Sequence, residues 1–468
     1  MTLPADLTIT GAAAALAAGA TTAVELATTL LDRIDALDDR IGSFITVRPT
    51  HEVLEEAEAS DERRGSDADR GPLDGIPIAH KDNIATAGIR TTAGSKALSE
   101  WIPDADATVV GRLADAGTVL LGKLKNYEFA HSAVDNVHFG RTRNPLDQNR
   151  VTGGSSSGSA AALAAGFCLG ATGTDTGGSI RIPASFTGVV GLKPTFGLIS
   201  RQGVVTTSWS LDTVGPMART AADAALLLSA MEGHDPLDRG SIPGVRSTPF
   251  LPLNDLAGLR IGVEHSYFTA GLDADVERVF TTSLDTMTGL GAEIVEIAIP
   301  AAAESIVVEK SIVYPEAAVA HEDRLGERFD AYGARLRLSL LSGYYFRAVD
   351  YVRAQQVRES LLDEVENALS QVDIIATPTT PLIAPRFAET AADAAGASEL
   401  LHRYIRFLVL ANLTGHPAVS VPYGTGDAGM PVGLQLIGRP FDDGFVLSVA
   451  HALEKHRDLA TTPSTTPA

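Results

Sequence analysis

The chain has 468 residues, of which 45% are hydrophobic and 20% charged, and its formal net charge is −21 at pH 7. This acidic balance argues against nucleic acid or an anionic membrane surface as a partner, because both attract Lys and Arg. A single cysteine, Cys168, excludes an internal disulfide, and no run approaches the ~18 apolar residues of a membrane-spanning helix. The alanine-rich start (11–20) has no basic residue before it, unlike a signal peptide, so we expect a cytoplasmic protein.

From the N-terminus onward, short apolar runs alternate with helical patterns. An amphipathic helix is predicted at 24–34, and further helices at 107–116, 159–165, 221–231, 274–288, 349–370, 399–410 and 443–456. Strands are predicted at 76–80, 119–121, 168–174, 259–263, 294–297, 374–376, 419–421 and 434–437. This alternation predicts one α/β unit with a mixed, largely parallel sheet that helices cover on both faces.

Two serine-containing turns flank one predicted helix–strand unit. Ser155 precedes the helix at 159–165, and Ser179 follows the returning strand at 168–174. A helix of about ten residues covers ~15 Å, and the strand running back cancels most of that length. We therefore expect Ser155 and Ser179 to lie at the same end of this unit.

Ser179 is the better candidate for a nucleophile. Thr176, Gly177 and Gly178 precede it, and glycines free the backbone to turn several N–H groups inward. Such donors stabilise the oxyanion of a tetrahedral intermediate, and removing one typically costs ~3 kcal/mol. The alternative is that the two glycines only make a turn.

Ser155 and Lys81 each allow a chemical and a structural interpretation. A hydroxyl donates and accepts at once, so Ser155 either relays a proton between nucleophile and base or caps the following helix. Lys81 ends the apolar run at 76–80, where burial would lower its pKa enough for it to act as a neutral base. Its alternative is a structural ion pair with Asp82 or Asp175. A neutral lysine and two serines are the parts of a nucleophilic hydrolase that needs no metal.

Three other sites fit the residues less well. Residues 154–158 match the Gly-x-Ser-x-Gly nucleophile elbow with Ser156 as nucleophile, but an elbow needs a strand before it and 144–150 is predicted to be a loop. The Gly/Ser loop before a helix suits phosphate, yet it lacks the lysine of phosphate-binding loops. No His-Glu-x-x-His or paired-Cys spacing supports a metal centre, so we expect neither metal nor cofactor.

Taken together, these segments resemble the amidase signature family. The resemblance is densest at 153–193, with further matches at 75–83, 128–130, 144–145, 211–216, 376–379 and 412–417. It covers nearly the whole chain, from about residue 5 to about residue 458. It implies a single α/β/α domain at 5–458 around a large mixed sheet, followed by a flexible tail at 459–468.

The resemblance also implies a role for each candidate residue. Ser179 is similar to the family's acylating nucleophile, Ser155 to its relay serine, held by a cis peptide bond, and Lys81 to its base. The implied oxyanion-hole residues, besides Ser179 itself, are Thr176, Gly177 and Gly178. The implied supporting residues are Asp175 and Arg181. The implied enzyme is an amidohydrolase that cleaves a carboxamide-type C–N bond in an amide, hydrazide or anilide through an acyl-enzyme on Ser179. It would release a carboxylic acid and ammonia or an amine.

One branch of the family hydrolyses glutamine as one component of a tRNA-dependent amidotransferase with partner subunits. In that branch an aspartate seven residues before the Asn-Leu-x-Gly motif holds the glutamine amino group, and this position here is Ile405. Arg358 resembles the branch's carboxylate-binding arginine. With only half of this clamp present, the sequence favours a stand-alone amidase, and the glutamine-hydrolysing amidotransferase component is the alternative.

The expected substrate is an amide with an aryl or other apolar acyl group. Trp209 stands where relatives often carry a small residue, and an apolar wall would combine it with Phe129, Tyr314, Tyr344 and Tyr345. His80 and His131 replace residues that are usually apolar, and each either lines the site or is structural. The predicted pocket residues are Phe129, His131, Trp209, Tyr314 and Arg358. The predicted partner is a small-molecule amide, with no nucleic acid and no membrane, and a homodimer is allowed because homodimers are common.

Overall fold

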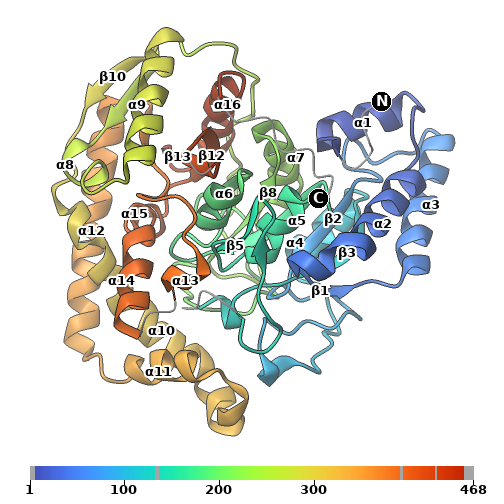
Figure 1. Ribbon diagram of the computed structural model, residues 1–468, viewed down its shortest axis with the longest axis horizontal. Helices are drawn as coiled ribbons and strands as arrows, with labels where there is room; N and C mark the ends of the chain where they lie inside the picture. Colours follow the sequence, from blue (N-terminus) through green and yellow to red (C-terminus); the bar gives the residue numbers. More distant parts are fainter. Residues whose placement is uncertain (1–5, 132–135, 391–393, 427–428, 458–468) are drawn as a thin grey trace.

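A mixed sheet of 11 strands forms the centre of the molecule. The computed structural model describes residues 6–131, 136–390, 394–426 and 429–457. The sheet contains β1 (Phe44–Val47), β2 (Pro77–Lys81), β3 (Val119–Leu124), β6 (Gly170–Asp175), β7 (Val190–Lys193), β8 (Thr213–Ala218), β9 (Arg260–Val263), β10 (Glu293–Glu296), β11 (Ile374–Pro378), β12 (Ala418–Thr425) and β13 (Pro431–Ile437). Their order is β1-β3-β2-β6-β8-β7-β12-β13-β11-β9-β10 (Figure 1). Every predicted strand is found in this sheet.

The strand directions correct one part of the prediction. β2 is parallel to β3 and β6, and β9 is parallel to β10 and β11. Between these two groups, β8, β7, β12 and β13 run antiparallel to their neighbours. The sheet is therefore mixed, as predicted, but it is not largely parallel. The prediction missed β1, β7 and β8. β1 and β7 have only four residues each, and β8 carries Gly215 and Pro216, which strands usually exclude.

Helices cover both faces of the sheet. They are α1 (Ile9–Ala17), α2 (Ala23–Ile41), α3 (Thr50–Gly65), α4 (Thr108–Asp115), α5 (Ser157–Ala164), α6 (Arg181–Thr187), α7 (Ala221–Met231), α8 (His265–Phe268), α9 (Ala274–Gly289), α10 (Ser305–Glu327), α11 (Ala334–Gly343), α12 (Ala348–Gln371), α13 (Phe387–Thr390), α14 (Ala394–Ile405), α15 (Val409–Thr414) and α16 (Asp443–Glu454). Side chains alternate between the two faces along a strand, so the residues of β6 contact the helix layers on both sides of the sheet. A Cβ at Gly170 would meet Leu227 of α7, whereas one at Gly173 would meet Ile180, just before α6.

The predicted helix at 399–410 is two helices with a turn between them. α14 ends at Ile405 and α15 begins at Val409. The carbonyls of the turn accept hydrogen bonds from buried side chains. Gln435 Nε2 donates to Phe407 O, and Arg181 Nη1 donates to Leu408 O. These hydrogen bonds replace those that a continuous helix would make. The sequence pattern of 399–410 could not reveal them, because Arg181 and Gln435 lie in other parts of the chain.

Two further predictions concern membranes and the tail. Of the helices in the described part of the chain, none combines the length and the apolar character that crossing a membrane requires. The predicted tail at 459–468 lies outside the described residues.

Candidate active site

Lys81, the last residue of β2, is fully buried and faces two hydroxyl groups. Its Nζ lies 2.8 Å from Ser155 Oγ and 2.7 Å from Thr174 Oγ1. No carboxylate of the described residues lies within ion-pair distance of Nζ, so the structural ion pair considered above does not form. Burial lowers the pKa of Lys81 to about 7, although the Asp175 and Asp212 carboxylates act to raise it. A neutral amine next to a hydroxyl is therefore accessible near neutral pH.

Ser155 and Ser179 meet at one end of the α5–β6 unit, as their spacing predicts. Both line the same small pocket, of about 70 Å³. The Gly154–Ser155 peptide bond is cis, as the family resemblance implies. The two serine loops are joined by a hydrogen bond of 3.1 Å from Ser156 N to Ser179 O. A Cβ at Gly154 would lie 2.4 Å from the ring of Tyr127, so only glycine lets the chain pass here.

The turn before Ser179 presents backbone donors to the pocket, which Thr176 and Gly177 also line. Within the described residues, the N–H groups of Thr176, Gly177 and Ser179 make no hydrogen bond. Gly178 differs, because its N–H donates to Asp175 Oδ1 at 2.8 Å. Three of the four N–H groups that the resemblance implies as oxyanion donors are thus without a hydrogen-bond partner in the described residues.

A buried ion pair stabilises the turn before Ser179. Arg181 and Asp175 are both fully buried, and Arg181 Nη2 lies 2.9 Å from Asp175 Oδ1. Arg181 also donates to Asn412 Oδ1 at 2.7 Å and to Gln435 Oε1 at 2.8 Å. Burial alone would raise the pKa of Asp175, but the Arg181 guanidinium and hydrogen bonds hold it well below its usual range. The sequence prediction gave no role to Asn412, although it lies in the Asn-Leu-x-Gly motif.

The rival elbow finds no support in the geometry. Ser156 is fully buried, and its Oγ accepts from Thr174 N and donates to Thr174 O, both at 3.3 Å. The prediction of a loop at 144–150 was wrong, because β4 (Arg143–Asn144) and β5 (Asp147–Val151) form a two-stranded ribbon. This ribbon is separate from the main sheet, whereas an elbow needs a central strand.

The pocket around Ser179 has mostly apolar walls. They are formed by Tyr127, Ala130, His131, Ile182, Val313, Leu401, Tyr404 and Ile405. Burial lowers the pKa of His131 to about 3, with smaller effects from Lys310 and His321, so its ring is neutral. Two charged residues of α10, Glu309 and Lys310, also line the pocket. The sequence prediction missed both, since the pattern of α10 was not recognised as a helix.

Of the five predicted pocket residues, the structure places only His131 in the lining. The Phe129 ring stacks on Tyr332 at 5.0 Å, because the positive φ at Phe129 directs it into the core. Trp209 is 63% exposed and lines a different pocket. Tyr314 lies behind His131, with ring centroids 5.8 Å apart.

Arg358, Tyr344 and Tyr345, which were also predicted near the substrate, do not line the Ser179 pocket. Arg358 donates to the carbonyls of Leu413, at 2.5 Å, and Ser210, at 3.3 Å. Tyr344 and Tyr345 are exposed. The predicted apolar wall of aromatic residues therefore does not form, since none of its members lines the Ser179 pocket.

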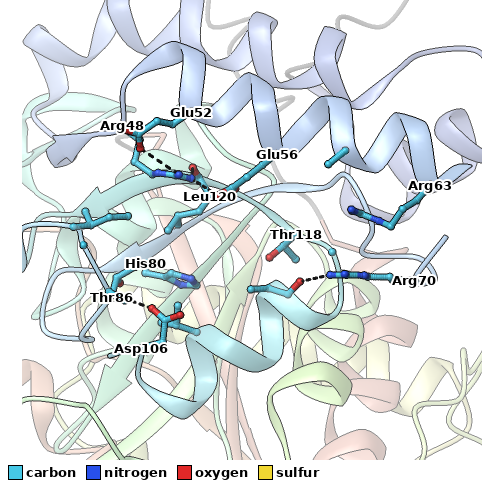
Figure 2. A pocket seen from close by; sticks show the side chains of 17 residues that line it. Arg48, Glu52, Glu56, Arg63, Arg70, His80, Thr86, Asp106, Thr118 and Leu120 are labelled. Carbon is cyan, nitrogen blue, oxygen red and sulfur yellow. Dashed lines mark hydrogen bonds and ion pairs between the residues drawn. The ribbon is translucent and has the colours of Figure 1, made fainter. Parts of the chain in front are cut away.

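His80 precedes Lys81 and therefore points to the other face of β2. It lines a separate pocket between α3 and α4, which Figure 2 shows together with Arg48, Arg63 and Arg70. Its Nδ1 lies 3.2 Å from Thr172 Oγ1, and burial lowers the pKa of His80 to about 3. His80 is thus a neutral histidine outside the Ser179 pocket.

Known proteins resemble this chain along nearly its whole length. The family model described as amidase matches residues 25–447. The glutamyl-tRNA(Gln) amidotransferase A subunit of Carboxydothermus hydrogenoformans is 42% identical, over 93% of this chain and 94% of the relative. The solved structure of its counterpart from Thermotoga maritima is 34% identical, with a TM-score of 0.82 over 97% of this chain and 95% of its own. A protein from a vestigial complex that reveals the origins of an s-triazine catabolic enzyme is 33% identical, with a TM-score of 0.89 over 97% and 100%.

These relatives correct the predicted partners. A small-molecule amide with at most a second copy of the chain was expected. That prediction is wrong, because relatives that match along almost the whole chain are named as one component of an amidotransferase. The error arose because the missing carboxylate at Ile405 led us to favour a stand-alone amidase over this branch.

Proposed function

The chain belongs to the amidase family, and on that premise we propose that it releases ammonia from the side-chain carboxamide of glutamine as the hydrolytic component of an amidotransferase. The main support for this reaction is the position of the buried Lys81. Its Nζ lies 2.8 Å from Oγ of Ser155, which lines the same pocket as Ser179. The choice of branch is supported by relatives of 42% identity that are named as such a component.

The proposed reaction begins with Ser179 Oγ attacking the carboxamide carbon. The proton of Ser179 passes to Ser155, whose own proton passes to the neutral amine of Lys81. The oxyanion that forms accepts hydrogen bonds from the N–H groups of Thr176, Gly177 and Ser179, a kind of stabilisation that supplies ~3 kcal/mol per donor. The proton then returns through Ser155 to the leaving nitrogen, and ammonia departs from the acyl-enzyme. Water cleaves the ester, which frees glutamate and Ser179.

A second candidate, a stand-alone amidase for uncharged amides, is favoured by two observations. Ile405 lines the pocket where the glutamine-hydrolysing branch has an aspartate. The Arg358 side chain donates its hydrogen bonds to the carbonyls of Leu413 and Ser210. This candidate needs the same Lys81, Ser155 and Ser179, so the two differ in substrate and not in mechanism. The cytoplasmic location stays a prediction.

Ammonia release from glutamine and from butyramide distinguishes these two candidates. We expect the purified full-length chain to show a kcat/KM for glutamine at least ~10-fold above that for butyramide, because only glutamine carries charges for the pocket to bind. Ser179→Ala protein is the control for contaminating glutaminase. The reverse preference, with butyramide hydrolysed and glutamine untouched, would assign the chain to the stand-alone amidases.

The pH dependence of kcat/KM should report on Lys81. Because the amine must be neutral to accept a proton, and its pKa is about 7, activity should rise as pH increases through that value. Below pH 7 the rate should fall by about tenfold per pH unit, since the neutral fraction falls in that proportion. The rate of Ser179 labelling by a fluorophosphonate should follow the same curve. Activity that stays constant from pH 5 to pH 9 would exclude Lys81 as the base.

A further inference from the structure

Two neighbouring charged residues of α10 reach the Ser179 pocket. Glu309 is 4% exposed, and its Oε1 lies 3.1 Å from the position of a Cβ added to Gly177. The carboxylate therefore rests against the turn that supplies the oxyanion donors. Lys310 lines the same pocket, and its Nζ lies 5.3 Å from the centre of the Tyr314 ring.

The two charges are paired only weakly. Lys310 Nζ lies 3.4 Å from Glu309 Oε2, and this oxygen has no hydrogen-bond partner in the described structure. Burial acts to lower the pKa of Lys310, but the Glu309 carboxylate outweighs it and the pKa is raised, so Lys310 is charged at neutral pH. A buried carboxylate oxygen without a hydrogen bond is costly, and it has capacity for a donor from a bound molecule.

The rest of the pocket lining is uncharged. Among its residues, all of them in the described part of the chain, Glu309 and Lys310 carry the charges, and His131 is neutral. A ligand with a single charge would separate the pair and leave one partner buried without compensation. A zwitterionic ligand would instead replace one weak ion pair with two charge-assisted contacts.

We propose that Glu309 binds the α-ammonium and Lys310 the α-carboxylate of an amino acid whose side-chain carboxamide meets Ser179. This inference rests on the proposed function and extends it, because it assigns substrate specificity to two residues of α10. It also explains how a chain with Ile405 in the pocket, and with Arg358 bound to carbonyls, would still hold both ends of glutamine. Glu309 and Lys310 are thus specificity-determining residues for zwitterionic substrates.

The test compares three substrates that differ in the charged groups they carry at the end remote from the carboxamide. They are glutamine, glutaramate, which lacks the ammonium, and butyramide, which lacks both charges. The variants are Glu309→Gln and Lys310→Met, and the matched controls are Glu304→Gln and Lys96→Met at exposed positions. Glu309→Gln should lower kcat/KM for glutamine by about 10- to 100-fold and leave butyramide within about twofold. Lys310→Met should lower kcat/KM for glutamine and for glutaramate by a similar factor, and the controls should change nothing.

Each alternative outcome has a distinct meaning. If wild-type protein hydrolyses glutamine and Glu309→Gln does so equally well, the proposed role of Glu309 is wrong while the proposed function stands. An equal loss with all three substrates would mean that Glu309 supports the turn and does not select substrate. If wild-type protein prefers butyramide, the glutamine assignment itself fails.

If the chain is inactive without its partner subunits, the proposal can still be tested by measuring glutamine binding. Glutamine should bind to Ser179→Ala protein in isothermal titration calorimetry, and the Ser179→Ala, Glu309→Gln double variant should lose at least ~10-fold in affinity. Equal affinity of the single and double variants would overturn the proposed role of Glu309 without any use of turnover.

Discussion

Replacing Ser179 by alanine should reduce amide hydrolysis by about 10⁴-fold or more, because it removes the atom that attacks the carbonyl. Lys81→Ala should cause a comparable loss, since no other described base lies within hydrogen-bond distance of Ser155 Oγ. Ser155→Ala should cost somewhat less, because a water molecule in the vacated space can carry the proton. Initial rates of ammonia release, measured with correctly folded variants, check this order.

The matched control for these variants is Ser156→Ala. Its hydroxyl is buried and hydrogen-bonded to the backbone of Thr174, so its removal should change activity only mildly. Peptide mapping after incubation with a fluorophosphonate should place a single adduct on Ser179. An inactive but folded Ser156→Ala protein beside an active Ser179→Ala protein would establish the elbow mechanism in place of the one proposed.

Replacing Asp175 by asparagine should destabilise the fold by about 3–5 kcal/mol, the usual cost of breaking a buried ion pair. The Arg181 guanidinium is fully buried, so it would keep its charge without a carboxylate to compensate it. Asp175 also fixes the turn before Ser179 through the N–H groups of Gly178 and Ile180. Activity should therefore fall together with stability, and urea unfolding followed by circular dichroism measures the free energy of unfolding.

A surface ion pair supplies the control for Asp175→Asn. Arg347 and Asp350 form an ion pair of 2.8 Å on the solvent-exposed start of α12. Exposed pairs contribute little to stability, so Asp350→Asn should leave the urea midpoint unchanged. An Asp175→Asn protein as stable as the wild type would show that Asn412 and Gln435 satisfy Arg181 without the carboxylate.

The local sequence around the candidate active site predicted much of its geometry. Lys81 ends a run of apolar residues, and such a run is buried whichever strands come to flank it. The lengths of the helix and strand between Ser155 and Ser179 bring the two serines to the same end of one unit. Both inferences depend on residues close in the chain, which is why periodicity and spacing were sufficient.

The walls of the pocket depend on packing between distant segments, and here the sequence prediction failed. Trp209 was assigned to the pocket because relatives often carry a small residue there, and Phe129 was expected to join it in an apolar wall. The Phe129 ring instead stacks on Tyr332 in the core, and Trp209 lies at the surface. Glu309 and Lys310 were overlooked because the sequence pattern of α10 was not recognised as a helix. Only the packing of α10 against the Ser179 turn brings them into the pocket.

The sequence by itself determined the α/β class, the amidase resemblance and the proximity of Ser155 to Ser179, because each is encoded in short motifs whose spacing constrains the backbone. The tertiary structure decided the antiparallel middle of the sheet, the partners of Arg181 and the charged residues that line the Ser179 pocket. These features join separate segments of the chain, and Arg181 donates to Asn412 and Gln435, which lie more than 200 positions away from it. Their formation depends on complementary shape and charge that no local pattern records. The preference for a stand-alone amidase depended on Ile405 and Arg358, and no sequence pattern indicated the Glu309 carboxylate that lines the same pocket as Ile405.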